Sequence, residues 1–170
     1  EMLGIVGESG CGKSVTAMSV LRLLPGPPAM YASGSIRFRG EELLTASEAR
    51  MRELRGNAIS MIFQEPMSAL NPVFTCGNQV MEAIRTHTGV SAKDARLKTL
   101  DLFQKVQLPE PELVLKKYPH QLSGGMLQRI MIGLALSMKP KILVADEPTT
   151  AIDAVTQYEI MREFEKIKRL

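Results

Sequence analysis

The sequence has 170 residues, enough for one well-packed domain, and 45% of them are hydrophobic against 23% charged. The formal net charge of +3 comes from Lys and Arg residues spread along the chain, and aromatic residues make up only 5%. These numbers favour a globular protein with a solvated surface. They count against a nucleic-acid-binding patch or a base-stacking platform.

The cysteines and the apolar runs exclude further classes. Cys11 and Cys76 are too few for a disulfide framework or a cysteine metal site, which suits a reducing compartment. No apolar run reaches the length of about 18 residues that a membrane-spanning helix needs. Because the chain opens inside an apolar run and closes inside a helical pattern, we expect it to be a fragment of a longer protein.

The first predicted unit is a strand, a glycine-rich loop and a helix. Residues 2–6 have the continuous apolar character of a buried strand, and residues 13–24 predict a helix that Pro25 ends. Between them, "GESGCGKS" matches the pattern G-x-x-x-x-G-K-[S/T] without exception. Such a loop wraps phosphates with its backbone, while Lys13 can bridge the β- and γ-phosphates and the Ser14 hydroxyl can hold Mg²⁺. We therefore predict a nucleotide-binding loop made of Gly7, Glu8, Ser9, Gly10, Cys11, Gly12, Lys13 and Ser14.

Two more strands are predicted before the chain turns helical. Residues 26–34 predict a loop, and the alternating residues 35–40 predict a partly exposed strand. The apolar residues 58–64 predict a second buried strand that ends in Gln64. Taken alone, Gln64 is typical of a polar strand terminus. Pro66 and Pro72 predict an irregular stretch.

Residues 77–138 predict a largely helical block. Ser91 and Asp94 have the spacing of a capping box at the start of one helix. Ser123-Gly124-Gly125 begins another helix, whose apolar residues recur at helical spacing: Leu127, Ile130, Met131, Leu134, Ala135 and Met138. A serine and two glycines at a helix start are also typical of an anion site, so a plain helix cap and a second phosphate site both stay open.

The last predicted strand carries two carboxylates. Residues 141–147, "KILVADE", are an apolar strand that ends in Asp146 and Glu147, and a final helix is predicted from about Ala154. Adjacent side chains of a strand point to opposite faces, so the two carboxylates can have different tasks. Asp146 suits a Mg²⁺ shell and Glu147 suits the polarising of a water molecule. The order of elements predicts an α/β core of residues 1–65 and 139–170, with a helical insertion at 66–138.

These motifs, in this order, resemble those of the ATP-binding cassette (ABC) ATPases. "GESGCGKS" resembles the Walker A loop, "FQEP" the Q-loop, "LSGGMLQR" the signature motif, "ILVADEP" Walker B and "TAID" the D-loop. Longer stretches, such as "FQEPMSALNPV" and "ADEPTTAID", resemble the subfamily that serves peptide and nickel importers of prokaryotes. The resemblance implies a P-loop NTPase (RecA-like) core with an inserted ABC α-helical subdomain.

The resemblance also implies a role for each site residue. Two cassettes would pair head to tail, with each ATP between the Walker A loop of one and the signature of the other. Glu147 would be the general base and Asp153 would couple the two sites. The Mg²⁺ ligands would be Ser14, Gln64 and Asp146, with Gln64 also contacting the attacking water as a catalytic residue. The residues that act in trans on the partner's ATP would be Ser123, Gly124, Gly125 and Gln128.

The implied protein is the ATP-hydrolysing subunit of a peptide importer, with nickel or another small solute as the alternative cargo. Its partners would be a second ATPase subunit, transmembrane permease subunits and, indirectly, a solute-binding protein, at the cytoplasmic face of the inner membrane. No nucleic-acid partner is implied. An adenine-stacking aromatic before Glu1 and a switch histidine after Leu170 would complete the family's site, so we expect the fragment alone to hydrolyse ATP poorly.

Two other classes stay open at this point. A soluble ABC ATPase that acts on DNA or ribosomes would carry long coiled coils or tandem cassettes, and neither pattern is visible in this sequence. A nucleotide-binding module without catalysis would not need both Lys13 and Glu147, so the presence of these residues counts against it.

Overall fold

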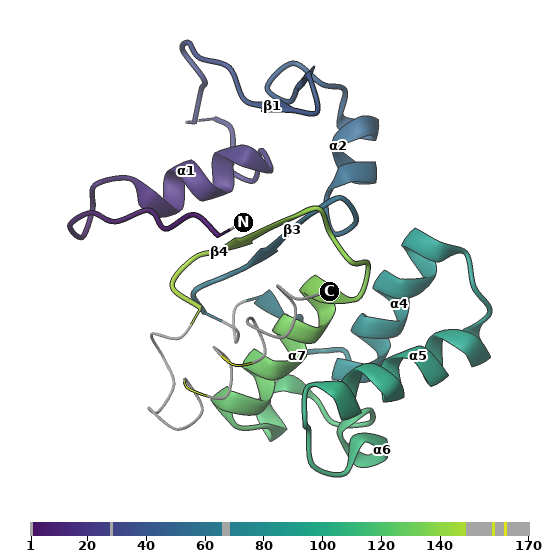
Figure 1. The fold of residues 1–170 in the computed structure, drawn as a ribbon. Helices are drawn as coiled ribbons and strands as arrows, with labels where there is room; N and C mark the ends of the chain where they lie inside the picture. Colours follow the sequence, from purple (N-terminus) through teal and green to yellow (C-terminus); the bar gives the residue numbers. More distant parts are fainter. Residues whose placement is uncertain (1, 28, 66–68, 149–157, 159–161, 163–170) are drawn as a thin grey trace.

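The computed structural model describes residues 2–27, 29–65, 69–148, 158 and 162 (Figure 1). At its centre lie two parallel strands, β3 (Ile59–Ile62) and β4 (Ile142–Ala145). Their register pairs Ile59 with Ile142 and Ile62 with Ala145. All four residues of β3 are buried, as is typical of a parallel strand that is covered on both faces.

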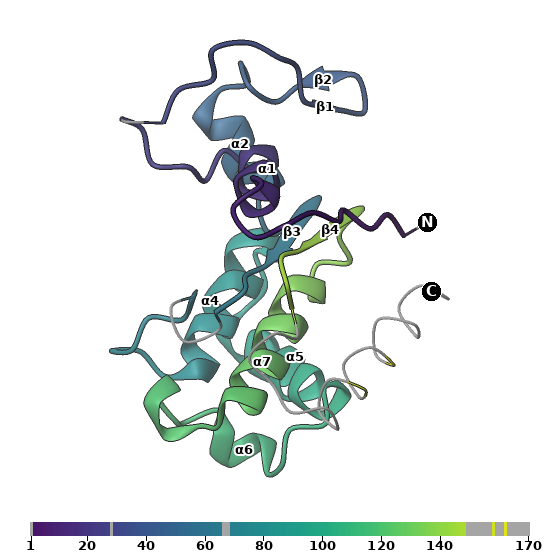
Figure 2. The same ribbon diagram turned by 90° about the vertical axis from the view of Figure 1, so that its left-hand side faces the viewer.

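One side of this strand pair is covered by the first part of the chain (Figure 2). It consists of helix α1 (Lys13–Val20), an antiparallel hairpin of β1 (Arg37–Phe38) and β2 (Glu41–Glu42), and helix α2 (Glu48–Leu54). The end of α1, the hairpin and α2 pack on β3 through a shared cluster of buried residues: Leu21, Phe38, Leu43, Met51, Leu54, Ile59 and Met61.

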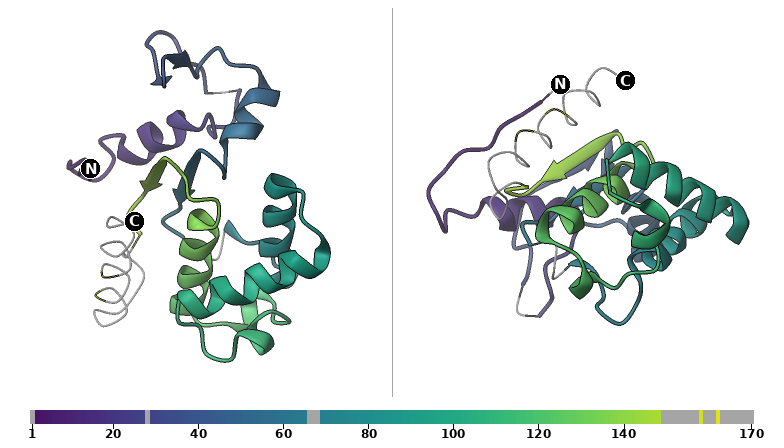
Figure 3. Two further views of the ribbon diagram at one scale, coloured as in Figure 1. Left: turned by 45° about the vertical axis from the view of Figure 1, so that its right-hand side comes forward. Right: turned by 90° about the horizontal axis from the view of Figure 1, so that it is seen from below.

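The other side is covered by helices, as the sequence predicts for the middle of the chain (Figure 3). These are α4 (Cys76–Thr88), α5 (Ala92–Lys105), the short α6 (Pro111–Val114), the 3-10 turn η1 (Pro119–Gln121) and α7 (Gly124–Leu136). The predicted cap of α5 is present, since the Ser91 Oγ accepts a hydrogen bond from the Asp94 N–H at 3.1 Å. The boundaries of the insertion at 66 and 138 stay a prediction.

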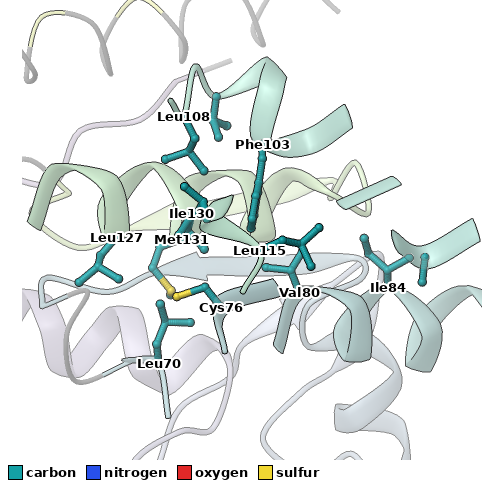
Figure 4. Packing of buried hydrophobic residues seen from close by; sticks show 13 residues of the cluster. Leu70, Cys76, Val80, Ile84, Phe103, Leu108, Leu115, Leu127, Ile130 and Met131 are labelled. Carbon is teal, nitrogen blue, oxygen red and sulfur yellow. The ribbon is translucent and has the colours of Figure 1, made fainter. Parts of the chain in front are cut away.

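The helical side has its own core, which Figure 4 shows. Phe103 of α5 and Ile130 of α7 are fully buried in it, together with Val80 of α4. The start of α4 lies close to the chain that follows α6. The Gly77 N–H donates to the Leu115 carbonyl at 3.2 Å, and a Cβ on Gly77 would lie only 2.4 Å from that oxygen. This close approach explains why a glycine stands at the second position of the helix.

Three sequence expectations need correction. Residues 2–6 form no strand, and Leu3 and Val6 are 85% and 96% exposed. An apolar run indicates a tendency to be buried, but a strand also needs a hydrogen-bonding neighbour, and in the described residues β3 pairs with β4 alone. Helix α1 ends at Val20 rather than before Pro25, because the chain turns through Arg22 with a positive φ of 50°. Strand β4 is also less buried than its sequence predicts.

Among the described residues, no helix combines the length and the apolar character needed to cross a bilayer.

Candidate nucleotide site

The phosphate loop connects the N-terminal segment to α1. Gly10 and Gly12 have φ values of 80° and 96°, a region of backbone conformation that favours glycine. A Cβ on Gly7 would lie 2.5 Å from the Cys11 Sγ, so a larger residue at this position would require the Cys11 side chain to move. Gly12 precedes α1 directly, and the first N–H groups of a helix have no partner within the helix. The loop therefore has the open backbone and free donors that suit an anion.

Lys13 is folded over this loop. Its Nζ donates to the carbonyl oxygens of Gly7 at 2.8 Å and Glu8 at 2.9 Å. The ammonium group thus lies against the backbone of the loop, where a phosphate oxygen could replace these carbonyls as its acceptor. Lys13 and the loop glycines fit a nucleotide phosphate.

Ser14 and Asp146 meet across the fold. The Ser14 hydroxyl donates to the Asp146 Oδ1 at 3.0 Å, although the two residues are 132 positions apart. Asp146 lies just beyond β4, where its N–H continues the strand pairing by donating to the Ile62 carbonyl at 3.0 Å. A hydroxyl and a carboxylate beside a phosphate loop are the oxygen ligands that Mg²⁺ prefers, so this pair fits the cation.

Gln64 and Glu147 form a second pair at the same edge of the strands. The Gln64 Nε2 donates to the Glu147 Oε2 at 3.0 Å, which leaves the amide oxygen of Gln64 as a possible cation ligand. Glu147 has a positive φ of 44°. This turn directs its carboxylate to Gln64 while the preceding Asp146 contacts Ser14. The two carboxylates therefore have separate partners, but both residues lie beyond β4, so the alternation of a strand does not account for this. The hydrogen bond from Gln64 was not predicted.

The signature residues lie at the start of α7. The Ser123 side chain accepts a hydrogen bond from the Met126 N–H at 3.3 Å, which makes Ser123 the N-cap of the helix. Ser123 and Gly124 are exposed and Gly125 is half-buried. Helices α1 and α7 lie on opposite sides of the β3–β4 pair (Figure 1). Asp153, the predicted coupling residue, lies outside the described residues.

Gln128 differs from its predicted role in trans. It is 2% exposed, and its Nε2 donates to the Pro148 carbonyl of the same chain at 2.5 Å. A side chain so placed does not face a partner, because the fold of its own chain surrounds it. A signal for this was present in the sequence. Most residues of α7 are apolar, and a polar residue that such a helix buries must find a partner inside the protein.

The model of the ABC transporter family matches residues 1–150 of this chain. The chain belongs to the ABC transporter family. This match confirms the resemblance drawn from the motifs, and with it the P-loop NTPase fold class.

Relatives and solved structures agree with this assignment. The chain is 54% identical to a probable peptide ABC transporter ATP-binding protein of Sinorhizobium fredii, in an alignment that spans 95% of this chain and 48% of that protein. It is also 50% identical to the dipeptide transport ATP-binding protein DppD of Bacillus subtilis, in an alignment that spans 99% of this chain and 50% of that protein. The chain thus spans about half the length of these curated relatives.

Among solved structures, the ABC cassette is similar to the ATP-binding cassette MJ0796, determined as a dimer in a post-hydrolysis state with ADP and Pi. The TM-score is 0.80 at 26% sequence identity, over 94% of this chain and 66% of that one.

Proposed function

We propose that this ABC cassette binds and hydrolyses ATP as the energy-coupling subunit of a peptide importer. The observation that carries the proposal is the meeting of Ser14 with Asp146 and of Gln64 with Glu147, each at 3.0 Å, beside an intact phosphate loop. Three motifs that are far apart in the sequence thereby form one site. Such a site, at the carboxyl ends of parallel strands, is where open α/β folds bind their ligands.

Binding is assigned to the loop and to the oxygen ligands beside it. The backbone of residues 7–14 surrounds the phosphates, and Lys13 compensates their charge. Ser14, Asp146 and the Gln64 amide oxygen are the ligands that would hold Mg²⁺. When bound, Mg²⁺ would neutralise the charge that develops on the phosphates.

Hydrolysis is assigned to Glu147, with Gln64 orienting its carboxylate. Glu147 accepts a proton from a water molecule whose oxygen attacks the γ-phosphorus. The bond from that phosphorus to the bridging oxygen breaks, and the products are ADP and inorganic phosphate. The carboxylate needs a fixed position for this step, and the hydrogen bond from Gln64 supplies one of its contacts.

The signature residues are assigned to the ATP of a partner cassette. Ser123, Gly124 and Gly125 are accessible at a helix start, but α7 and the chain's own phosphate loop helix lie on opposite sides of the strand pair. A head-to-tail dimer would bring these donors to the partner's γ-phosphate, with Asp153 as the proposed link between the two sites. The dimeric state of the similar cassette MJ0796 supports such a pairing.

Peptides are the proposed cargo, because the names of the relatives refer to peptide or dipeptide transport. In this proposal ATP-driven closure of the dimer drives permease subunits at the cytoplasmic face of the cell membrane, and a solute-binding protein delivers the peptide.

The test is the substitution Glu147→Gln in the purified full-length protein, because the fragment alone is expected to hydrolyse ATP poorly. Removal of the general base should lower ATP turnover by about a hundredfold or more while ATP binding persists, and ATP should then trap a stable dimer. Phosphate release and size-exclusion chromatography measure the two effects. Glu53→Gln, an exposed carboxylate of α2, is the matched control. Unchanged turnover in Glu147→Gln would contradict the assignment of the base.

A further inference from the structure

Gln128 lies on the side of α7 that faces the strand pair. One helical turn further along, Ile132 packs with Ala135 against Ile62 of β3 in a small buried cluster. Gln128 continues this line of residues toward the end of β4, and only 2% of its surface is exposed. Its neighbours in the helix, Leu127 and Ile130, are fully buried and apolar. An apolar residue would therefore satisfy the packing at this position.

A glutamine at this position does something that an apolar residue cannot do. Its Nε2 donates to the Pro148 carbonyl at 2.5 Å, across 20 positions of sequence. Burial of an amide costs free energy unless the amide is hydrogen-bonded, so this contact fixes the side chain and the carbonyl relative to each other. Proline itself has no N–H, so the backbone of Pro148 can take part in hydrogen bonds only through its carbonyl.

Pro148 directly follows Glu147, the proposed general base. The Glu147 side chain receives a hydrogen bond from Gln64, and its backbone has a positive φ of 44°. Such a conformation is unfavourable for a residue with a side chain and persists only where its surroundings hold it. Gln128 holds Pro148, the residue after Glu147, and Gln64 holds the Glu147 carboxylate. Two glutamines from different elements therefore fix the position of the Glu147 carboxylate.

The same helix begins with the signature motif. Ser123 lies five residues before Gln128, which is about 7.5 Å along the axis of a helix. Because a short helix moves as a rigid body, a displacement of its N-terminus is passed on to Gln128.

We propose that Gln128 is a positioning residue that links the signature helix to the general base of the same chain. The inference rests on the proposed function. When Ser123 contacts the ATP held by a partner cassette, α7 and Gln128 determine the position of the Glu147 carboxylate. This carboxylate acts on the chain's own ATP. Each copy thus contains a physical connection between the two composite sites of a dimer.

The test compares Gln128→Met and Gln128→Glu with the wild type, each in the full-length protein. Met keeps the approximate volume without a donor, and the Glu carboxylate places an acceptor against the Pro148 carbonyl. Thr99→Val is the matched control, because Thr99 is fully buried and its hydroxyl bonds only to Ala95 of its own helix. We expect both Gln128 variants to lose about tenfold or more in kcat while KM and the ATP dissociation constant stay within about twofold. Thr99→Val should keep wild-type kcat even where its melting temperature falls.

The outcomes separate this inference from the proposed function. If the wild-type protein hydrolyses ATP and both Gln128 variants keep kcat within twofold, the inference is wrong and the function stands. A loss of ATP binding that matches the loss of turnover would also overturn it, because a positioning role predicts an effect on the chemical step alone. If the full-length wild-type protein neither binds nor hydrolyses ATP, the proposed function fails and the inference fails with it.

Discussion

Cys11 and Cys76 show that the surroundings of a residue determine its chemistry. Cys11 is exposed in the phosphate loop, with the Lys13 ammonium 3.8 Å from its sulfur. Cys76 is fully buried at the start of α4, and this burial raises the pKa of its thiol to about 11. Because the thiolate is the reactive form, Cys76 stays protonated and inert at neutral pH, whereas Cys11 is accessible to reagents.

A thiol reagent should therefore distinguish the two cysteines. In the native protein at pH 7.5 we expect one thiol per chain to react with an aromatic disulfide reagent, and the second only after unfolding in denaturant. ATP should slow the first reaction, because the proposed phosphate site includes Cys11. Mass spectrometry of the labelled peptides identifies the residue, and Cys11→Ser is the control that should leave no reactive native thiol. Rapid native labelling of Cys76 would contradict its burial.

At this scale, the motifs did not predict all the contacts that the proposed site residues make. Ser14 and Asp146 were expected to share a cation and do lie within hydrogen-bonding distance. Taken alone in the sequence, Gln64 is typical of a polar strand terminus, and the family resemblance implies its catalytic role. Its contact with Glu147 depends on the parallel register of β3 and β4. Gln128 was assigned to the partner because a motif records neighbours in sequence, whereas the direction of a side chain depends on the packing of the whole helix.

At the scale of elements, the local capping signals were reliable, and three of the four predicted strands are present while the one at residues 2–6 is not. Ser91 and Ser123 begin helices where the sequence places them, since a cap needs only residues within one turn. Residues 2–6 have a strand-like composition without strand pairing, because pairing depends on distant segments. Helix α4 depends on a contact of another kind, the close approach of its second residue, Gly77, to Leu115.

Gly77→Ala should accordingly destabilise the helical side of the molecule. A Cβ would lie 2.4 Å from the backbone oxygen of Leu115, which cannot rotate away as a flexible side chain could. Overpacking of this kind costs about 1–3 kcal/mol. Chemical denaturation measures the loss, and Gly4→Ala, where nothing lies within 4 Å of the added carbon, is the control. Equal stability of the two variants would show that α4 can shift freely.

At the scale of the whole molecule, the β3–β4 pair separates the two halves of the proposed composite site. The phosphate loop and α1 lie on one side of the pair, and the signature helix lies on the other (Figure 1). The order of motifs could be read from the sequence, but this separation depends on the three-dimensional fold. It favours a site that is completed by a second copy.

Complementation between two inactive variants tests this arrangement. Ser123→Arg should spare ATP binding yet abolish hydrolysis, since an arginine at the helix start blocks the partner's γ-phosphate. Lys13→Ala should lose the binding of ATP phosphates. An equal mixture should recover about a quarter of wild-type turnover, because half of random dimers are mixed and each mixed dimer has one intact site. Absence of recovery, or a loss of ATP binding in Ser123→Arg, would contradict a site shared between copies.

The register of the central strands has a consequence for the order of folding. Pairing Ile59 with Ile142 joins segments that are 83 positions apart (142 − 59), and the helical core forms within the intervening chain. Closing so long a loop costs conformational entropy, and this cost arises before the strand pairing can stabilise the fold. We therefore expect the helical core to form first and strands β3 and β4 to pair afterwards. Asp146 and Glu147 reach Ser14 and Gln64 only in that final step, so a chain still emerging from the ribosome would acquire its helical core before it could hold a nucleotide.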